Sequence, residues 1–208
     1  MLAPLRILGD KGSGNCLKVL WTAQLLQIPF EWEDVDVTSD RSDARRTRSA
    51  EFLAMNPFGE IPVVILPDGR TLAQSNAIMR FLARGTSLLP DDPYQQAKVD
   101  EWLFWEQYSH EPYLAVCRSQ MRFVGKRADE REAWRVARGE AALDLLERTL
   151  VSKTYLVNNT LTLADIALVA YTRWAHEGGF DLVSRPHLRG WIGRCEAALG
   201  ISQHQSAA

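Results

Sequence analysis

The sequence predicts a mixed α/β domain with the element order β-α-β-α-β-β-α, followed by an all-helical domain. In the first 84 residues, short apolar runs alternate with segments whose apolar residues recur at helical spacing. Residues 85–93 are rich in Gly, Pro and Asp, which is typical of a linker. Beyond them the apolar residues follow helical spacing only. We therefore expect domains at residues 1–84 and 94–208.

The composition is that of a globular protein with little charge bias. Of the 208 residues, 46% are hydrophobic and 24% are charged, which suits one large domain or two modest ones. The formal net charge of −2 offers no basic excess for nucleic acid. The three cysteines are odd in number and widely spaced, which argues against disulfides and a zinc site. No apolar run reaches the ~18 residues of a membrane span, so we expect a cytoplasmic protein without a metal or membrane contact.

The α/β domain is expected to begin with a strand, a helix and a second strand. Leu5–Gly9 is a short apolar run before a turn cluster, which predicts the first strand. Helical spacing begins at Cys16 and is ended by Pro29. Phe30–Val37 is rich in aromatic and β-branched residues and predicts the second strand. Charged residues dominate 39–48, which indicates a solvated loop.

The remainder of this domain is expected to hold a short helix, a hairpin and a closing helix. The short helix lies around Phe52–Met55 and stops before Asn56-Pro57. The strand Pro62–Leu66 turns at Pro67-Asp68-Gly69 and returns as Thr71–Ala73. The closing helix has Ser75 as its cap and one apolar face, made of Ile78, Phe81 and Leu82.

The periodicity after the linker predicts four helices. They are a long helix through Val99–Trp105 that Pro112 kinks or ends, a second from about Glu130 to Leu150, a third from Thr162, and a last one through Leu188–Leu199. Thr162 and Asp165 have the spacing of a capping box, in which the acid binds the backbone N–H at the helix start.

Ile61-Pro62 is a first candidate binding feature. A proline at the head of a strand has no N–H to donate, which suits a place where the chain meets a ligand or a sheet edge. If this peptide bond is cis, the backbone N–H and C=O of Ile61 face outward and can pair with an extended peptide. The alternative is an ordinary strand-edge proline.

Gln74-Ser75 and Ser13-Gly14-Asn15 are two further candidates, each at a predicted helix N-terminus. A carboxylate at the first would be held by Ser75 and oriented by Gln74. At the second, the Ser13 hydroxyl can donate to a thiolate and so favour ionisation of a bound thiol, whose free pKa is about 8.5. The alternative in both places is an ordinary helix cap.

Taken in this order on this frame, the segments resemble the cytosolic glutathione transferase family over nearly the whole chain. The resemblance is to bacterial members with a serine at the reactive position. Its matching segments are 13–19, SGNCLKV; 52–63, FLAMNPFGEIPV; 72–78, LAQSNAI; 102–112, WLFWEQYSHEP; and 161–167, LTLADIA.

The resemblance implies a thioredoxin-like N-terminal domain, an all-helical C-terminal domain and a homodimer. It implies that Pro62 is a cis proline and that Ile61 pairs through its backbone with the cysteinyl part of glutathione. Gln74 and Ser75 would hold the γ-glutamyl carboxylate. Ser13 would be catalytic, and Asn15 would also contact the sulfur.

Two departures from the family pattern affect the site. Cys16 lies three residues past the reactive position and is interpreted as a packed helix residue, which argues against chemistry by an enzyme thiol. Glu60, in the glutathione-binding segment, stands where many members have a basic residue. The cation for the glycine end of glutathione would then come from Arg46 or Arg48. An acid from the neighbouring subunit, Asp100 or Glu101, is expected to reach the glutathione amine.

The second substrate is expected in an apolar pocket between the domains, lined by Tyr108, His110 and Tyr113. For His110 the alternative is a hydrogen-bonded helix histidine. The activity that the resemblance implies is attack of the glutathione thiolate on a small hydrophobic electrophile. The alternatives are glutathione-dependent disulfide reduction or isomerisation, and a binding protein without catalysis.

Overall fold

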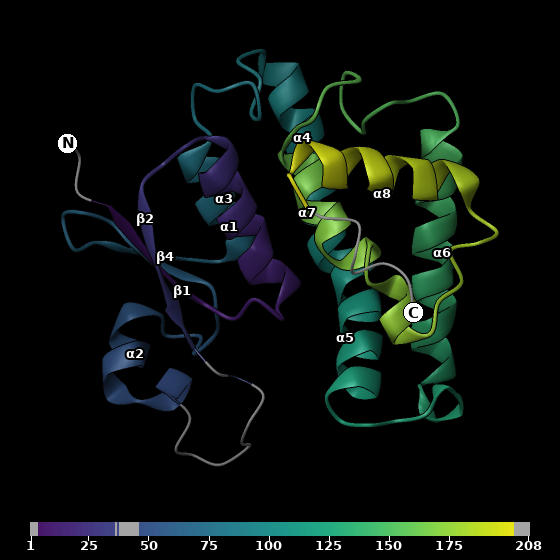
Figure 1. Ribbon diagram of the computed structural model, residues 1–208, viewed down its shortest axis with the longest axis horizontal. Helices are drawn as coiled ribbons and strands as arrows, with labels where there is room; N and C mark the ends of the chain where they lie inside the picture. Colours follow the sequence, from purple (N-terminus) through teal and green to yellow (C-terminus); the bar gives the residue numbers. More distant parts are fainter. Residues whose placement is uncertain (1–3, 36, 38–45, 202–208) are drawn as a thin grey trace. The chain divides into compact units, whose positions relative to one another are not determined.

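The computed structural model describes residues 4–35, 37 and 46–201, and the chain divides into two compact units, Met1–Arg84 and Gly85–Ala208 (Figure 1). Each unit has its own core, and each is considered by itself. Of the charged stretch 39–48, residues 39–45 lie outside the described part of the chain. Arg46–Arg48 form a turn of 3₁₀-helix.

The N-terminal unit is a four-stranded mixed sheet with the order β2-β1-β3-β4. β1 (Leu5–Gly9) runs parallel to β2 (Phe30–Asp34) and antiparallel to β3 (Val63–Ile65), while β4 (Thr71–Ala73) returns antiparallel beside β3. Three helices complete it: α1 (Gly14–Leu25), α2 (Ala50–Met55) and α3 (Ser75–Leu82). The thioredoxin-like order β-α-β-α-β-β-α is thereby confirmed.

Alternation along the two central strands separates the helices onto opposite faces of this sheet. Ile7 and Val64 point to one face, where they pack with Val19 of α1 and Ile78 of α3. The adjacent residues Leu8 and Val63 point to the other face and pack with Phe52 of α2. The side-chain period of 2 in a strand therefore assigns α1 and α3 to one layer and α2 to the other, as Figure 1 shows.

Several boundaries and faces in this unit differ from the expectation. β2 ends at Asp34, before Val37. The N-cap residue of α3 is Gln74, whose side chain makes no capping hydrogen bond, and Ser75 is the first residue of the helix. Phe81 is 43% exposed because the buried stripe of this short helix runs through Ile78 and Met79 instead.

The C-terminal unit is all helical, as predicted. Its α-helices are α4 (Pro93–Trp105), α5 (Glu111–Arg122), α6 (Ala133–Leu150), α7 (Leu163–Thr172) and α8 (Pro186–Ala198), with short 3₁₀ turns at Ala128–Glu130 and Ala175–Gly178. α4 begins at Pro93, inside the expected linker, because Asp92 accepts a hydrogen bond from the Gln95 N–H and caps it. None of the helices in the described ranges has the length and hydropathy to cross a bilayer.

α4 and α5 are joined by a π-helical segment, Glu106–His110, so the long predicted helix is neither simply kinked nor ended at Pro112. Pro112 lies in the first turn of α5, where a missing N–H costs nothing. Single π-helical turns occur frequently at functional sites. The segment contains two of the predicted electrophile-pocket residues, Tyr108 and His110.

α7 is the centre of the helical unit, since all ten of its residues are buried. Its Asp165 binds three parts of the unit. One carboxylate oxygen accepts from the Leu156 N–H (2.9 Å) and from Nε1 of Trp191 on α8 (2.9 Å). The other accepts from the Thr162 N–H (3.0 Å) and hydroxyl (3.2 Å), which is the acidic half of the predicted capping box.

Asp165→Ala is therefore expected to lower the free energy of unfolding by about 3 kcal/mol or more, because it leaves several buried donors without an acceptor. Asp165→Asn keeps an oxygen for Leu156 and Trp191 and should lose less. Chemical denaturation followed by tryptophan fluorescence measures both effects. Asp129→Ala is the control, because its 3.1 Å ion pair with Arg127 is exposed and worth little. Equal midpoints for Asp165→Ala and Asp129→Ala would contradict this role.

Candidate functional site

The sheet register brings three separate segments of the N-terminal unit to one end of the sheet. Leu8 of β1 pairs with Val63 of β3, and Val63 pairs with Ala73 of β4. β1 leaves the sheet here toward Ser13, β3 enters it here from Ile61-Pro62, and β4 leaves it here toward Gln74. The three candidate features of the sequence are thus neighbours because of strand pairing.

A tight turn after β1 positions Ser13. Its N–H donates to the Asp10 carbonyl (3.0 Å), and its own carbonyl accepts from the Leu17 N–H (3.0 Å) as the N-cap of α1. The side chain of Ser13 makes no capping bond to α1. The Ser13 side chain is half-buried at the helix start.

Cys16 is a packed helix residue, as interpreted from the sequence. It is fully buried, and burial raises the pKa of its thiol to about 11, although the Asp10 backbone and the Ser13 hydroxyl oppose this shift. A thiol with so high a pKa is not a nucleophile near neutral pH. Cys16 is therefore not suited to act as an enzyme thiolate.

The corner between β4 and α3 has an unusual backbone. Gln74 has φ 68° and ψ 109°, a left-handed conformation that non-glycine residues seldom adopt and that costs on the order of 1 kcal/mol or more. It is exposed, and its carbonyl accepts from the Ile78 N–H (3.0 Å). The next residue, Ser75, is buried. Such strained corners are concentrated at ligand clamps, and the first backbone N–H groups of α3 add a site for an anion.

Asn15 connects the two helix N-termini. Its side-chain oxygen accepts from the Ser75 hydroxyl (3.3 Å) and from Nζ of Lys18 (2.8 Å). Lys18 is fully buried, which the sequence analysis missed. The sequence does place Lys18 between Leu17 and Val19 on an apolar helix face. It also lies three residues after Asn15, which puts both side chains on the same side of the helix.

Ile61-Pro62 is a cis peptide bond, in agreement with the resemblance. The loop before it is held by Asn56, a buried side chain. Its Nδ2 donates to the Glu60 carbonyl (2.7 Å) and its oxygen accepts from the Phe58 N–H (3.1 Å). Ile61 is half-buried and precedes the first residue of β3, so it lies beyond the end of the ladder.

The two candidate cations of the preceding loop have different surroundings. Arg46 pairs with Glu33, whose other partner is Arg6 (2.6 Å), and these arginines lower the pKa of Glu33. Arg48 instead donates to the Phe58 carbonyl (3.3 Å) and packs over the Gly59 backbone, next to the Glu60–Pro62 segment. Arg48 is therefore the arginine beside the candidate site.

The remaining predicted residues lie in the helical unit. Tyr108 is 81% exposed, whereas His110 is fully buried, with Nε2 2.9 Å from the Thr172 hydroxyl. Tyr113 is also buried, and its hydroxyl accepts from Arg138 (2.9 Å). Asp100 on α4 is half-buried, and the exposed Glu101 forms an ion pair with Lys98 (2.6 Å).

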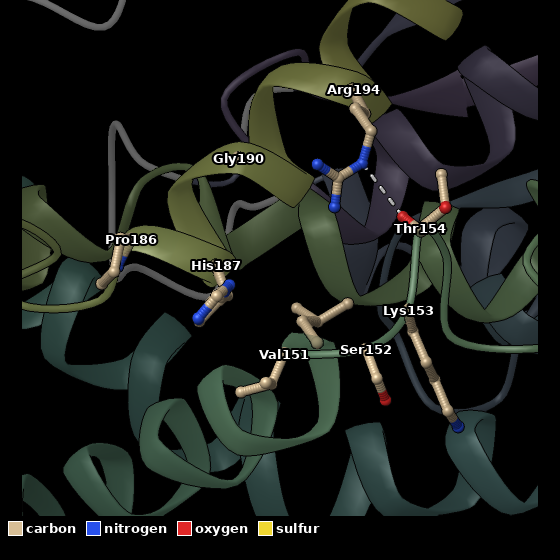
Figure 2. Close-up of a pocket in the computed structure, with 9 residues that line it drawn as sticks. Val151, Ser152, Lys153, Thr154, Pro186, His187, Gly190 and Arg194 are labelled. Carbon is tan, nitrogen blue, oxygen red and sulfur yellow. Dashed lines mark hydrogen bonds between the residues drawn. The ribbon is translucent and has the colours of Figure 1, made fainter.

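Two surface cavities of the helical unit contain none of the predicted site residues. One, of about 490 Å³, lies beside the end of α6 and the start of α8, where Arg194 donates to the Thr154 carbonyl (3.0 Å; Figure 2). The other, of about 520 Å³, lies between the segment around Phe180 and α8. Within the described residues there is no group of three or more side chains suited to a metal ion.

Comparisons with known proteins show the class of protein to which this fold belongs. The family model for the glutathione S-transferase N-terminal domain matches residues 12–84, and the model for the C-terminal domain matches residues 105–198. A solved glutathione S-transferase from Pseudomonas fluorescens is 43% identical, with a TM-score of 0.87 over 94% of this chain and 96% of that one.

Curated relatives agree. Glutathione S-transferase theta-1 of Bos taurus is 33% identical over 95% of this chain and 85% of its own length. The chain therefore belongs to the glutathione transferase family. A probable elongation factor 1-gamma of Arabidopsis thaliana is also similar, at 32% identity over 76% of this chain, but the chain spans only 38% of that protein.

The cysteine chemistry of the chain gives a direct prediction. Cys16, Cys117 and Cys195 are all buried, and burial raises the pKa of each thiol. Iodoacetamide at pH 7.5 should leave the native protein unmodified over a time in which all three thiols react in denaturant, as read by intact mass. Native Cys16 labelling at the rate of a free thiol would contradict the assignment of a packed, protonated residue.

Proposed function

We propose that this protein is a glutathione transferase that activates the glutathione thiol for attack on a small hydrophobic electrophile. The observation that carries the proposal is the register Leu8–Val63–Ala73, which gathers Ser13, Ile61-Pro62 and Gln74-Ser75 at one end of the sheet. Family membership alone would not be enough, since one fold hosts unrelated activities. Retention of all three features in one place supports a working site.

In this proposal the tripeptide is held along its backbone. The γ-glutamyl carboxylate lies at the α3 N-terminus, bound by the Ser75 hydroxyl and N–H groups and oriented by Gln74. The cysteinyl part pairs with the backbone of Ile61, like a short added strand beside β3. The glycine carboxylate is bound by Arg48, and Glu60 flanks this end. Asp100 of a second subunit is proposed to reach the amine in a homodimer.

The sulfur is handled by Ser13 and Asn15. A hydroxyl and an amide N–H that donate to sulfur favour the thiolate over the thiol, which lowers the thiol pKa. The proton leaves to solvent and the sulfur lone pair attacks the electrophile. A new carbon–sulfur bond forms as the leaving group departs with its electron pair. Holding both partners in place supplies the remaining rate increase.

The electrophile is proposed to bind an apolar surface that includes Tyr108. Among the three residues predicted for this pocket, its ring is the one most open to solvent, since His110 and Tyr113 are buried. The buried side chains of His110 and Tyr113 would instead support the conformation of the segment Glu106–His110. The protein is proposed to work in the cytoplasm, with glutathione as co-substrate and no metal.

A binding protein without catalysis is the second candidate, and the similarity to an elongation factor 1-gamma favours it. Disulfide reduction by bound glutathione is a third possibility that needs no enzyme thiol. Calorimetric titration with glutathione, combined with turnover against panels of electrophiles and disulfides, separates the three. Conjugation supports the proposal. Binding without turnover would establish the second candidate, and no glutathione binding at all would overturn the proposed site.

Ser13→Ala is expected to raise the pH needed for conjugation. Because the lost hydroxyl stabilises the charged thiolate, the pKa of bound glutathione should rise by about 1 to 2 units, and kcat/KM at pH 6.5 should fall roughly 10- to 100-fold. The loss should shrink at higher pH. Ser13→Thr retains a hydroxyl and is the control. Superimposable pH–rate profiles for Ser13→Ala and the unmodified protein would refute this role.

Arg48→Ala is expected to weaken glutathione binding about 10-fold, the size of one charge-assisted hydrogen bond. Arg46→Ala should change it little, because Arg46 pairs with Glu33. Calorimetry with glutathione and with its glycine ethyl ester tests the assignment, since the ester lacks the charge that Arg48 would bind. Arg48 is not the partner of the glycine carboxylate if both ligands lose equal affinity in Arg48→Ala.

A further inference from the structure

We propose that Arg138 is a specificity-determining residue that binds a carboxylate group on an aromatic electrophile. The inference rests on the proposed function and deepens it, since it names a substrate class for the surface that includes Tyr108. It starts from a contrast between two arginines at the start of α6, Arg135 and Arg138, which lie about one turn apart. Among the described residues, only Arg135 of this pair has an acidic partner.

The charge of Arg135 is neutralised within the helical unit, whereas that of Arg138 is not. The Nε atom of Arg135 donates to the Glu132 carboxylate at 3.2 Å. Within the part of the chain that the structure describes, Arg138 forms no ion pair with a carboxylate. The acid closest to it in sequence on α6 is Glu140, which pairs with Arg185 instead (2.6 Å). Arg138 therefore presents a cation that no acid of its own helix neutralises.

Aromatic side chains hold the guanidinium of Arg138 in place although the residue is exposed. Its Nη1 donates to the Tyr113 hydroxyl at 2.9 Å, and its Cζ lies 5.7 Å from the centre of the Tyr113 ring and 5.8 Å from that of Trp134. The two rings meet edge to face, with their centres 6.3 Å apart. A cation held in this way has already lost much of its rotamer freedom, so a ligand does not have to order it.

The surface around Arg138 is aromatic and open to solvent. Tyr108 and Trp134 are both exposed, and α6 packs against the π-helical segment Glu106–His110 that contains Tyr108. The hydrogen bond to Tyr113 raises the pKa of Arg138, and the Tyr108 phenol adds to this shift, so Tyr108 lies within electrostatic reach of the guanidinium. Exposed aromatic rings offer flat apolar area to the ring of a substrate.

The chemistry of a guanidinium then selects the charged group of the ligand. Arg138 stays positively charged at every pH at which a thiol is activated, because its pKa is above the range of thiols. A guanidinium has five N–H donors in a planar fork, and the contact with Tyr113 uses one of them. A carboxylate can accept two parallel N–H bonds from such a fork. An aromatic substrate with a carboxylate is thus complementary to this surface in both shape and charge.

A matched pair of electrophiles tests the inference on the full-length protein. The compounds are para-(chloromethyl)benzoate and its methyl ester, which share the reacting carbon and differ in one negative charge. In both, the glutathione thiolate forms a carbon–sulfur bond at the benzylic carbon as chloride departs with the bonding electron pair. The ratio of kcat/KM for the carboxylate to kcat/KM for the ester should fall about 10-fold in Arg138→Gln. The loss should lie in KM more than in kcat, because the charge is remote from the reacting carbon.

Two further variants show whether the effect belongs to this position. Arg148→Gln removes the same charge from an exposed residue in the last turn of α6 and should keep the ratio of the unmodified protein. Arg138→Lys keeps a charge without the planar fork and should keep part of the preference. Equal ratios in Arg138→Gln and the unmodified protein would overturn the inference and leave the proposed function standing. An equal fall in Arg148→Gln would assign the effect to net charge and would also overturn it.

Binding decides the inference if the protein holds glutathione without turnover. Calorimetry then compares S-(para-carboxybenzyl)glutathione with its benzoate methyl ester. A loss of affinity in Arg138→Gln that is confined to the carboxylate conjugate would support the inference, and equal losses for both conjugates, or none, would overturn it. If neither glutathione nor either conjugate binds to the unmodified protein, the proposed function has failed and the inference falls with it.

Discussion

The pairing of β3 with both β1 and β4 is the constraint on which the rest of the N-terminal unit depends. Because Val63 is opposite Leu8 on one side and Ala73 on the other, three connections must meet at one end of the sheet. A slip of one residue would turn Val63 and Val64 to the wrong faces and separate α2 from its core. The same pairing thus specifies the hydrophobic layers and the site.

Polar side chains, not the sheet itself, then fix the three connections in detail. Asn56 holds the loop before Ile61 through two backbone groups, and Asn15 joins α1 to α3. Both are short amides that accept and donate in fixed directions, which apolar packing cannot do. In the helical unit Asp165 has a comparable role, with four donors around one buried carboxylate. Satisfied buried networks of this kind hold a single arrangement.

Much of the fold could be predicted from the sequence, because its strands and helices have clear periods and strong breakers. Leu5–Gly9 and Thr71–Ala73 were predicted to the residue. What the sequence could not supply was the direction of individual side chains. Lys18 and Phe81 follow apolar neighbours, yet the lysine is buried and the phenylalanine is 43% exposed. Local spacing does not determine this, because it depends on which distant element covers each face. The sequence predicted Ser75 as the cap of α3, but the N-cap residue is Gln74. Its positive φ cannot be predicted from the residue type.

The left-handed backbone at Gln74 has a consequence for how a ligand is received. The conformational freedom of this corner is lost when the chain folds, and the sheet and α3 maintain the strained angle from both sides. For the tripeptide proposed to bind here, the backbone that would receive its carboxylate is already fixed in the folded chain. Under the proposed function, recognition at this end would be preorganised, and selectivity among thiol peptides would depend on fit to this rigid corner.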